Sequence, residues 1–456
     1  MTLRTRILKA HPATLVLASF LLAITAGALM LKLPVATKTL HISWVDALFT
    51  ATSAVCVTGL VVVDTGSYFT VFGQCVILSL IQIGGLGVMT ISVALFRWIG
   101  RSVSFRHRMV MQDLFAHTPR EDIFGLVKSI VLFTFGAEVI GAVLLTIHWS
   151  RELPFLRAAY TAVFHSVSAF CNAGFALFSD SMVRYSDNLL LNMTVCSLIV
   201  VGGIGFPVLY DLQSWFVRRK EKRVRLSIQT KTVLMTTVAL IISGALMFAF
   251  LERQALGNPQ SLSHRILAPL FQSITCRTAG FNTVDIAALK DATLAIMIFL
   301  MFFGASPGSC GGGVKTTTLA LLTAFTFSRI RRRRRVNMFK KSIPGETVTR
   351  SVSLILVSIG IICVVLFLIL VGDSASGDEV VGPRRSFLVY LFETVSAFGT
   401  VGLSMGVTPA LKTWGKCWII LTMIIGRVGV LTFSYIIVGT GTTNGIEYSE
   451  ENLMIG

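Results

Sequence analysis

One short sequence pattern occurs four times in this chain, and it constrains the fold more than any other feature. Each copy ends on a glycine that leucine or phenylalanine follows; the four glycines are Gly59, Gly174, Gly280 and Gly402. They are 115, 106 and 122 residues apart (174−59, 280−174, 402−280). Ten positions before them stand Phe49, Phe164, Leu270 and Phe392. Six positions before them stand Ser53, Ser168, Ile274 and Ser396, so the third copy departs there and carries Thr275 one place later. Such self-similarity indicates one supersecondary unit that is used four times.

Long apolar segments flank every copy of the pattern. The chain is 54% hydrophobic and only 14% charged, whereas about a quarter of the residues in a soluble globular domain are charged. Runs of about twenty apolar residues are long enough to cross the ~30 Å hydrocarbon core of a bilayer. The first run follows basic residues as a signal peptide would, but equivalent runs precede the other copies, so we interpret it as a spanning helix. The chain is therefore predicted to be a polytopic membrane protein.

Each unit of the repeat reads as a long, a short and a second long apolar segment. The predicted spans are 13–33, 69–96, 125–149, 189–212, 231–251, 292–327, 352–371 and 417–438. Ser43 and Asp46 have capping-box form at the start of the first short segment. A helix of about 12 residues measures ~18 Å, which is too short to cross. The short helices are therefore expected to enter the membrane and stop halfway, ending near residues 54, 170, 275 and 398.

The predicted fold class is an all-α polytopic membrane protein. It contains four M1–P–M2 units (span, half-helix pore loop, span) in a pseudo-fourfold arrangement, with eight spanning helices. The predicted units are 1–96, 97–212, 213–328 and 329–440, and a C-terminal tail follows at 441–456.

The distribution of charge predicts the orientation. The formal net charge is +18, and basic residues gather between the units, as at 218–223 and 329–341, whereas loops beside the short helices carry aspartates. By the positive-inside rule, both termini and the inter-unit loops lie in the cytoplasm, and the half-helices enter from outside. The arginine run at 331–335 could meet anionic lipid or a cytosolic partner; as it lies between apolar runs, we expect no nucleic acid.

The four glycine segments are the predicted ion-binding site. Non-helical backbone at membrane depth is tolerated only where it is buried in protein or lines a water-filled cavity. Four such segments around one axis would present rings of carbonyl oxygens, which can replace the hydration shell of an alkali cation. Glycine permits the backbone angles and the close approach, and the C-terminal ends of the short helices favour a cation. The predicted filter residues are Val57, Thr58, Gly59, Asn172, Ala173, Gly174, Thr278, Ala279, Gly280, Thr400, Val401 and Gly402.

The second long segment of each unit has its own glycine motif. The motifs begin at Gly84, Gly202, Gly304 and Gly426, between 24 and 28 residues after the filter glycines. We expect these glycines to allow close helix packing around the pore. In the third unit, 304–318 contains five glycines and a proline, which cannot sustain a regular helix, so we predict a loop that plugs the pore below the filter. A phosphate-binding loop is excluded, because Val314 separates the glycines from Lys315.

In the fourth unit, Arg427 stands near the middle of an apolar span. An arginine there costs from about 2.5 to over 10 kcal/mol, so it should face the interior and find partners. Carbonyls of the broken third-unit helix are candidates; Arg427 could oppose a cation that leaves the filter, or it could only tie helices together. The predicted gate residues are Gly304, Gly308, Gly311, Gly312, Gly313, Lys315 and Arg427.

Other polar residues give no sign of an enzyme. The sequence has no paired carboxylates, no nucleophile–base set and no His/Cys ligand cluster, and its eight cysteines include no CxxC pair, so we expect neither catalysis nor a disulfide or metal site. Glu138 is expected to bond two helices, and His165 and Glu393 to brace the short helices. The alternatives to a filter that selects one alkali cation are a sodium-preferring or weakly selective pathway, a secondary transporter with a midplane site and a non-transporting scaffold.

The filter segments, the stretch 311–318 and Arg427 resemble those of the Trk/Ktr/HKT superfamily of potassium transporters. The resemblance covers essentially the whole chain and is closest to the bacterial KtrB-type membrane subunit, which has eight spans. It implies a potassium pore within each chain, a homodimer that the C-terminal tail helps to build, and a cytosolic ring of nucleotide-binding (RCK/KTN-type) regulatory subunits. It also implies location in the bacterial inner membrane and gating by 304–318 and Arg427. Serine at the first filter position favours sodium in plant relatives, so Gly59 points to K+; Na+ could still act as an activator. Cys310 in the gate loop could make gating sensitive to thiol reagents.

Overall fold

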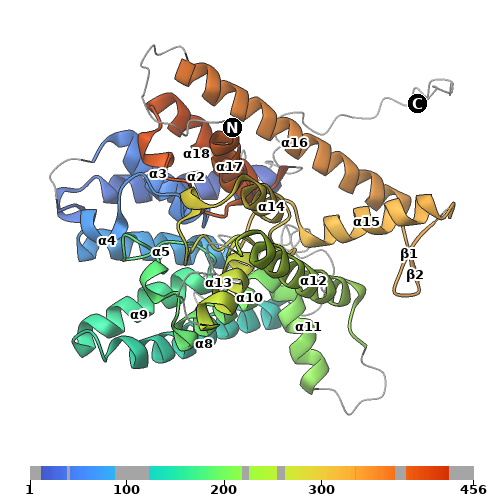
Figure 1. The fold of residues 1–456 in the computed structure, drawn as a ribbon, viewed down its shortest axis with the longest axis horizontal. Helices are drawn as coiled ribbons and strands as arrows, with labels where there is room; N and C mark the ends of the chain where they lie inside the picture. The colour runs from blue at the N-terminus through green and yellow to red at the C-terminus, as the bar shows by residue number, and fades with distance from the viewer. Residues whose placement is uncertain are drawn as a thin grey trace, which may run out of the picture.

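The computed structural model describes residues 12–38, 42–87, 123–217, 225–253, 262–333, 335–374 and 387–430. The predicted tail at 441–456 and the basic segment at 218–223 lie outside these residues. Helices make up most of the described chain (Figure 1).

Four long helices open the predicted units: α2 (Pro12–Leu31), α8 (Ile123–Trp149), α12 (Ile228–Leu251) and α16 (Gly345–Ser374). They carry exposed apolar side chains, such as Leu132 at 64%, Leu246 at 66% and Phe367 at 64% exposure. Such faces require an apolar solvent, which the hydrocarbon of a bilayer provides. Among the described residues, Lys128–Trp149, Ile228–Leu251 and Gly345–Asp373 are long and apolar enough to span a membrane, and one bent helix pair could be a fourth span. The count of eight spans stays a prediction.

Four short helices lie at the predicted places: α3 (Trp44–Val55), α9 (Phe155–Phe170), α13 (Leu262–Thr275) and α17 (Phe387–Gly399). The first begins as expected, because the Ser43 hydroxyl accepts a hydrogen bond from the Asp46 amide at 3.0 Å. Their aromatic side chains are buried, with Phe49, Phe164 and Phe392 at 0% exposure. In the third copy, the spacing of the repeat places Leu270 at this position, but the buried aromatic residue is the neighbouring Phe271.

Four further helices follow the glycine segments: α5 (Val71–Leu86), α10 (Leu189–Ile204), α14 (Asp291–Phe302) and α18 (Thr413–Val428). The prediction of one continuous span over 189–212 was wrong. Helix α10 ends at Gly205, whose φ is +100°, and α11 (Phe206–Val217) leaves at 96° to it. Gly87 and Gly429 end α5 and α18 with φ of +79° and +95°. A positive φ ends a right-handed helix, and glycine adopts it without a steric penalty.

The second long helix of each unit also contacts the short helix of the next unit. These contacts join α5 to α9, α10 to α13 and α14 to α17, and α18 of the last unit returns to α3 of the first. The packing order of the four repeats is therefore closed on itself.

The remaining elements are short, apart from α15 (Thr316–Ile330), which resumes after the loop that follows α14. They are η1 (Pro34–Ala36), α4 (Thr65–Tyr68), η2 (Val183–Tyr185), η3 (Ile286–Ala288) and η4 (Thr408–Ala410). Strands β1 (Val336–Met338) and β2 (Lys341–Ile343) form an antiparallel hairpin between α15 and α16. The expectation of an all-α chain missed this hairpin, whose two strands are only three residues long each.

Candidate functional site

The four filter glycines meet in a closed ring. The Cα of Gly59 faces the carbonyl oxygen of Ala173 so closely that an added Cβ would collide with it. An added Cβ on Gly174 would lie 2.8 Å from the Ala279 oxygen, and one on Gly280 would lie 2.5 Å from the Val401 oxygen. Gly402 faces the Thr58 oxygen in the same way and closes the ring. Each glycine thus touches the carbonyl that precedes the next glycine.

The backbone repeats one conformation in all four segments. Gly59, Gly174, Gly280 and Gly402 have φ of +92°, +69°, +80° and +92°. Two positions earlier, Val57, Asn172, Thr278 and Thr400 also have positive φ, between +49° and +73°. Non-glycine residues rarely adopt such angles, so the surrounding structure must impose them. Because the strained angles recur at equivalent positions, we infer that the four segments have the same role.

The third segment is one residue shorter than the others. In the first, second and fourth segments, the amide before the glycine (Thr58, Ala173, Val401) donates to the carbonyl of a serine five residues back (Ser53, Ser168, Ser396). In the third, the Ala279 amide donates to Thr275, only four residues back, at 2.9 Å. Thr275 therefore takes the place of the serine, which explains why Ile274 broke the sequence pattern.

Hydroxyl groups at these positions hold the glycine segments. The Ser53 and Ser396 hydroxyls accept hydrogen bonds from the amides of Gly59 and Gly402, each at 3.1 Å. The hydroxyls of Ser168 and Thr275 instead donate to the carbonyls of Phe175 and Phe281, at 2.7 and 2.6 Å. All four short helices end beside the ring, so their partly negative C-terminal ends approach it.

Two titratable residues of the short helices, which were expected to brace these helices, bond instead mainly to the chain after the filter segments. His165 accepts the Leu177 amide at 3.2 Å through Nε2 and contacts the Thr161 carbonyl at 2.8 Å through Nδ1. Glu393 Oε1 accepts hydrogen bonds from the Ser404 hydroxyl (2.5 Å), the Thr408 amide (3.0 Å) and the Thr408 hydroxyl (2.6 Å). Both side chains are buried, and these bonds join the short helices to the loops that follow the filter segments.

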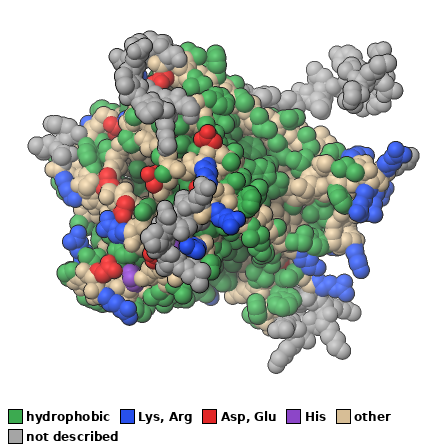
Figure 2. Space-filling view, viewed as in Figure 1, with side chains coloured by type: hydrophobic (Ala, Val, Ile, Leu, Met, Phe, Trp, Pro, Cys, Tyr) green, Lys and Arg blue, Asp and Glu red, His purple; other side chains and the backbone are tan. Residues whose placement is uncertain are grey.

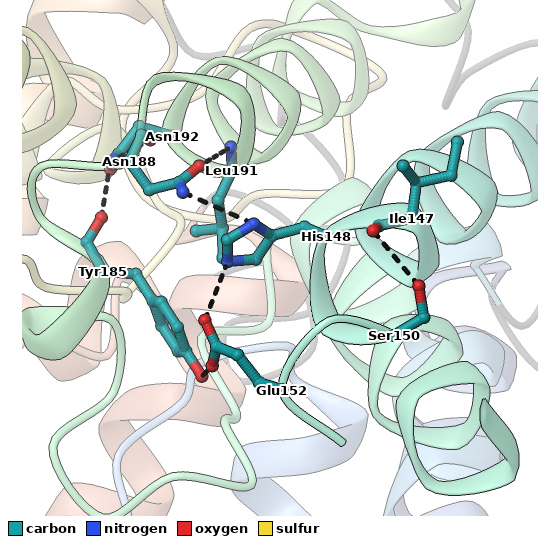
Figure 3. A network of polar contacts seen from close by, with 8 residues as sticks. All are labelled: Ile147, His148, Ser150, Glu152, Tyr185, Asn188, Leu191 and Asn192. Atoms are coloured by element: carbon teal, nitrogen blue, oxygen red, sulfur yellow. Dashed lines mark hydrogen bonds and ion pairs between the residues drawn. The ribbon is translucent and has the colours of Figure 1, made fainter. Parts of the chain in front are cut away.

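A polar network lies where α8 ends and α10 begins in the second unit (Figure 3). Tyr185 donates to Glu152 at 3.1 Å, Glu152 lies 3.6 Å from His148, and Asn188 contacts the other ring nitrogen of His148 at 3.4 Å. In the same loop, the hydrogen bond from Arg184 holds the pKa of Asp180 below its ordinary value.

Glycines of the second long helices allow them to approach the short helices, as predicted. An added Cβ on Gly84 would collide with the Val55 carbonyl, one on Gly202 with Phe170, and one on Gly426 with Phe398. In the third unit, an added Cβ on Gly304 would lie 2.5 Å from the Thr278 methyl group. Val55, Phe170 and Phe398 each stand four residues before a filter glycine, so the contact is the same in these three units.

The stretch between α14 and α15 is non-helical and lies against the ring. The Gly312 amide donates to the Thr400 hydroxyl at 2.8 Å, and an added Cβ on Gly311 would collide with the Thr278 hydroxyl. In the same loop, the Cys310 amide donates to the Gly202 carbonyl (3.3 Å), and the Gly313 amide donates to the Gly426 carbonyl (3.1 Å). Its residues are buried or half-buried, as irregular backbone at membrane depth must be.

Within the loop, the Lys315 ammonium donates to the carbonyls of Gly311 and Gly312, at 2.8 and 3.4 Å. At the other end of the loop, the Gly308 carbonyl accepts the Phe206 amide at 2.9 Å, where α10 bends into α11.

Arg427 joins the loop to the first unit. Its guanidinium donates to the carbonyl of Cys310 in the loop and to the carbonyl of Gly84 at the end of α5. The predicted partner, a carbonyl of the broken helix, is thus present. Gly84 was not foreseen, because sequence spacing within one unit says nothing about contacts between units.

The predicted filter residues come together in the ring, and the predicted gate loop lies against them, except for Gly308 at the bend between α10 and α11. The structure also shows a buried cation that the sequence analysis did not single out. Arg277, directly before Thr278, is 7% exposed and donates to the Thr237 hydroxyl at 3.2 Å. The sequence does contain a sign of this site, because an arginine is unusual between a buried short helix and a filter glycine. Glu138 behaves as expected: it accepts a hydrogen bond from Gln82 of the neighbouring α5 at 3.3 Å.

The carbonyl oxygens beside the four filter glycines are neutral donors. The ring offers neutral carbonyl oxygens, which suit a weakly charged, hard cation. In the described part of the chain, no group of three or more His, Cys, Asp or Glu residues could hold a metal ion.

Comparisons with known proteins show which family the chain belongs to. The sequence matches the TrkH family, described as "Cation transport protein", over residues 6–439. It is 41% identical to Ktr system potassium uptake protein B of Vibrio alginolyticus, over 97% of this chain and 94% of that one. It is 37% identical to Ktr system potassium uptake protein B of Bacillus subtilis, over 98% and 97% of the two chains. It is 36% identical to potassium/sodium uptake protein NtpJ of Enterococcus hirae, over the same shares.

The fold also matches a solved structure. The crystal structure of the potassium transporter TrkH from Vibrio parahaemolyticus superposes with a TM-score of 0.72 at 19% identity, covering 95% of this chain and 86% of that one. These relatives are cation transporters and not enzymes, as the sequence predicted. The chain is a multi-pass membrane protein that belongs to the TrkH family of cation transport proteins.

Proposed function

We propose that this chain takes up potassium by passing dehydrated K+ through a carbonyl-lined filter formed within one polypeptide. The observation that carries the proposal is the ring in which each filter glycine touches the carbonyl before the next glycine. Its four segments, and the closed packing order of the helices around them, support four M1–P–M2 units arranged about one axis. The names of the relatives, which are potassium uptake proteins over nearly the whole chain, support K+ as the substrate.

The loop 304–318 and Arg427 form the proposed gate below the filter. The loop contacts Thr278 and Thr400 of two filter segments. Arg427 adds a fixed positive charge beside the loop, which would oppose a cation on the same path. Opening then requires the loop to leave Thr400 and Arg427 to release Cys310.

The proposed assembly is a homodimer in the bacterial inner membrane, with both termini in the cytoplasm and a nucleotide-binding regulatory ring beneath. The relatives named as parts of a Ktr system support a separate regulatory subunit. The tail at 441–456 is proposed to contribute to the dimer, and Na+ to act as an activator.

Growth rescue tests the function. Cells that lack their own potassium uptake systems should grow at micromolar-to-millimolar K+ when they express this chain with its regulatory subunit. Failure to grow, with the chain present in the membrane at the level of a working transporter, would favour a non-transporting scaffold.

A sodium-accepting pathway is the second candidate, because one relative is named a potassium/sodium uptake protein. Uptake of Rb+ in a large excess of Na+ separates the two. Persistent Rb+ uptake supports a potassium filter, and competition by Na+ at equal concentration supports the alternative. A midplane site would use one or two broken helices, which fits a ring of four similar segments poorly.

A further inference from the structure

A cavity of about 460 Å³ lies away from the ring, between α15, the β1–β2 hairpin and the first turns of α16. Its lining includes Arg329 and Arg335, the hydroxyl residues Thr349 and Ser353, and the apolar Val352. Leu321, Val336 and Val348 form a small apolar core that joins these three elements. The cavity is therefore a formed part of the fold rather than a gap between mobile segments.

The chemistry of the cavity favours an anion. Between residues 325 and 353 the chain has nine basic residues and one acidic residue, Glu346. Glu346 already pairs with Arg350 at 2.6 Å, and neither Arg329 nor Arg335 forms an ion pair with a described residue. Gly345, where α16 begins, also lines the cavity, so the positive end of the helix dipole points into the same space. Arginine is the side chain best suited to bind a phosphate through two parallel hydrogen bonds.

An apolar path leads out of the cavity along α16. Helical spacing places Leu356, Ile359 and Phe367 on the same face as Val352. Their side chains are 64%, 47% and 64% exposed. A ligand with a charged head and an apolar tail would match both features, whereas a free phosphate would use only the first.

The hairpin beside the cavity is suited to a membrane surface. Phe339 and Lys340 connect its strands with φ of +48° and +64°, a turn conformation in which Asn-Gly is the usual pair. This strained turn holds Phe339 at 39% exposure, next to Lys340 and Lys341. Aromatic and basic side chains together are typical of the lipid–water interface. Figure 2 shows Lys and Arg side chains gathered at this end of the molecule, beside the apolar middle.

We propose that this cavity binds the headgroup of an anionic phospholipid. Arg329 and Arg335 contact the phosphate, the first turn of α16 completes the anion site, and an acyl chain lies along Val352, Leu356 and Ile359. This site is independent of the ion pathway, so it does not depend on which cation the protein carries.

Lipid retention by the full-length protein tests the proposal. The delipidated protein in non-ionic detergent is mixed with phosphatidylglycerol or with phosphatidylcholine of the same chain length, and bound lipids are counted by native mass spectrometry. Phosphatidylglycerol should bind more tightly, and the double variant Arg329→Gln/Arg335→Gln should weaken its binding roughly tenfold to thirtyfold. Arg329→Lys/Arg335→Lys retains the charge but loses the paired hydrogen bonds, so it should bind more weakly than the parent and more tightly than the glutamine variant, which controls for folding.

The matched control removes the same charge outside the cavity. Arg331→Gln/Arg332→Gln should bind phosphatidylglycerol like the parent; an equal loss in this variant would mean diffuse attraction and overturn the proposal. Complete displacement of the lipid by millimolar inorganic phosphate would assign the cavity to a soluble anion. If lipid binds only after deletion of the acidic tail at 441–456, the tail is the occupant and the proposal is wrong.

Discussion

At the scale of single residues, each filter glycine meets two requirements that no other amino acid can meet together. Each has a positive φ, and each leaves no room for a Cβ beside the carbonyl of the next segment. A non-glycine residue would cost about 1–2 kcal/mol for the left-handed conformation alone. It would also displace the neighbouring carbonyl, so a substitution in one segment distorts the next one.

We therefore expect Gly59→Ser and Gly402→Ser to reduce the preference for K+ over Na+. The added side chains would displace the carbonyls of Ala173 and Thr58 and widen the ring. The measurement is Rb+ uptake in excess Na+. Gly406→Ser is the matched control, because Gly406 also has a positive φ (+85°) but nothing within 4 Å of an added Cβ. Rb+ uptake that is as resistant to Na+ in the filter variants as in the control would contradict the filter assignment.

The sequence predicted which residues form the ring but not how the third segment fits into it. A glycine and its neighbours recur visibly, so the four segments could be aligned. The loss of one residue between Thr275 and Gly280 became clear only from the hydrogen bond between Ala279 and Thr275. Arg277 has no counterpart in the other three copies, so a comparison of the copies did not single it out.

At the scale of elements, the loop between α14 and α15 is bonded to three other units at once. It donates to Gly202 of the second unit and to Thr400 and Gly426 of the fourth, and Arg427 connects it to Gly84 of the first. Each hydrogen bond is worth about 0.5–1.5 kcal/mol. The loop can therefore be held closed by several weak bonds that break together.

Deleting residues 308–313 should raise the rate of K+ uptake, because it removes the amides that bond to Gly202, Thr400 and Gly426. The rate is measured as initial Rb+ influx per amount of protein in proteoliposomes. Ser309→Ala is the control: it keeps the loop length and removes only the hydrogen bond to the Ser306 carbonyl. If the deletion and the control transport at the same rate as the parent, the loop is not a gate.

The short helices were predictable because their length, flanking glycines and burial all derive from local sequence. The ends of the second long helices were not. Gly87, Gly205 and Gly429 lie in apolar runs that continue past them, and apolar composition alone cannot separate a helix from a bend. The bend at Gly205 is stabilised by a contact from another unit, the Phe206 amide to the Gly308 carbonyl at 2.9 Å.

At the scale of the whole molecule, the two ends of the described chain differ in charge. The end with α15 and the hairpin shows Lys and Arg side chains, the opposite end shows acidic side chains among further Lys and Arg, and apolar side chains cover the middle (Figure 2). By the positive-inside rule, this difference predicts that the end with α15 and the hairpin faces the cytoplasm.

Labelling from either side of the membrane checks this orientation. After the exposed Cys75, Cys363 and Cys417 are replaced by serine, a new cysteine is introduced as Ser179→Cys or Lys340→Cys, both at exposed positions. A membrane-impermeant maleimide should label the first in right-side-out vesicles and the second in inverted vesicles. Each variant is the control for the other, and the reverse pattern would overturn the orientation.

One polypeptide supplies every side of the ring, and the sides are not identical. A tetramer of equal subunits would have to repeat any intruding loop or arginine four times, and those copies would crowd one narrow passage. A continuous chain can carry Arg427 in its fourth unit, and the glycine-rich loop and the shortened filter segment in its third. It does not have to repeat these features in the first two units. Fusion of the four repeats therefore permits asymmetric control of a nearly symmetric opening.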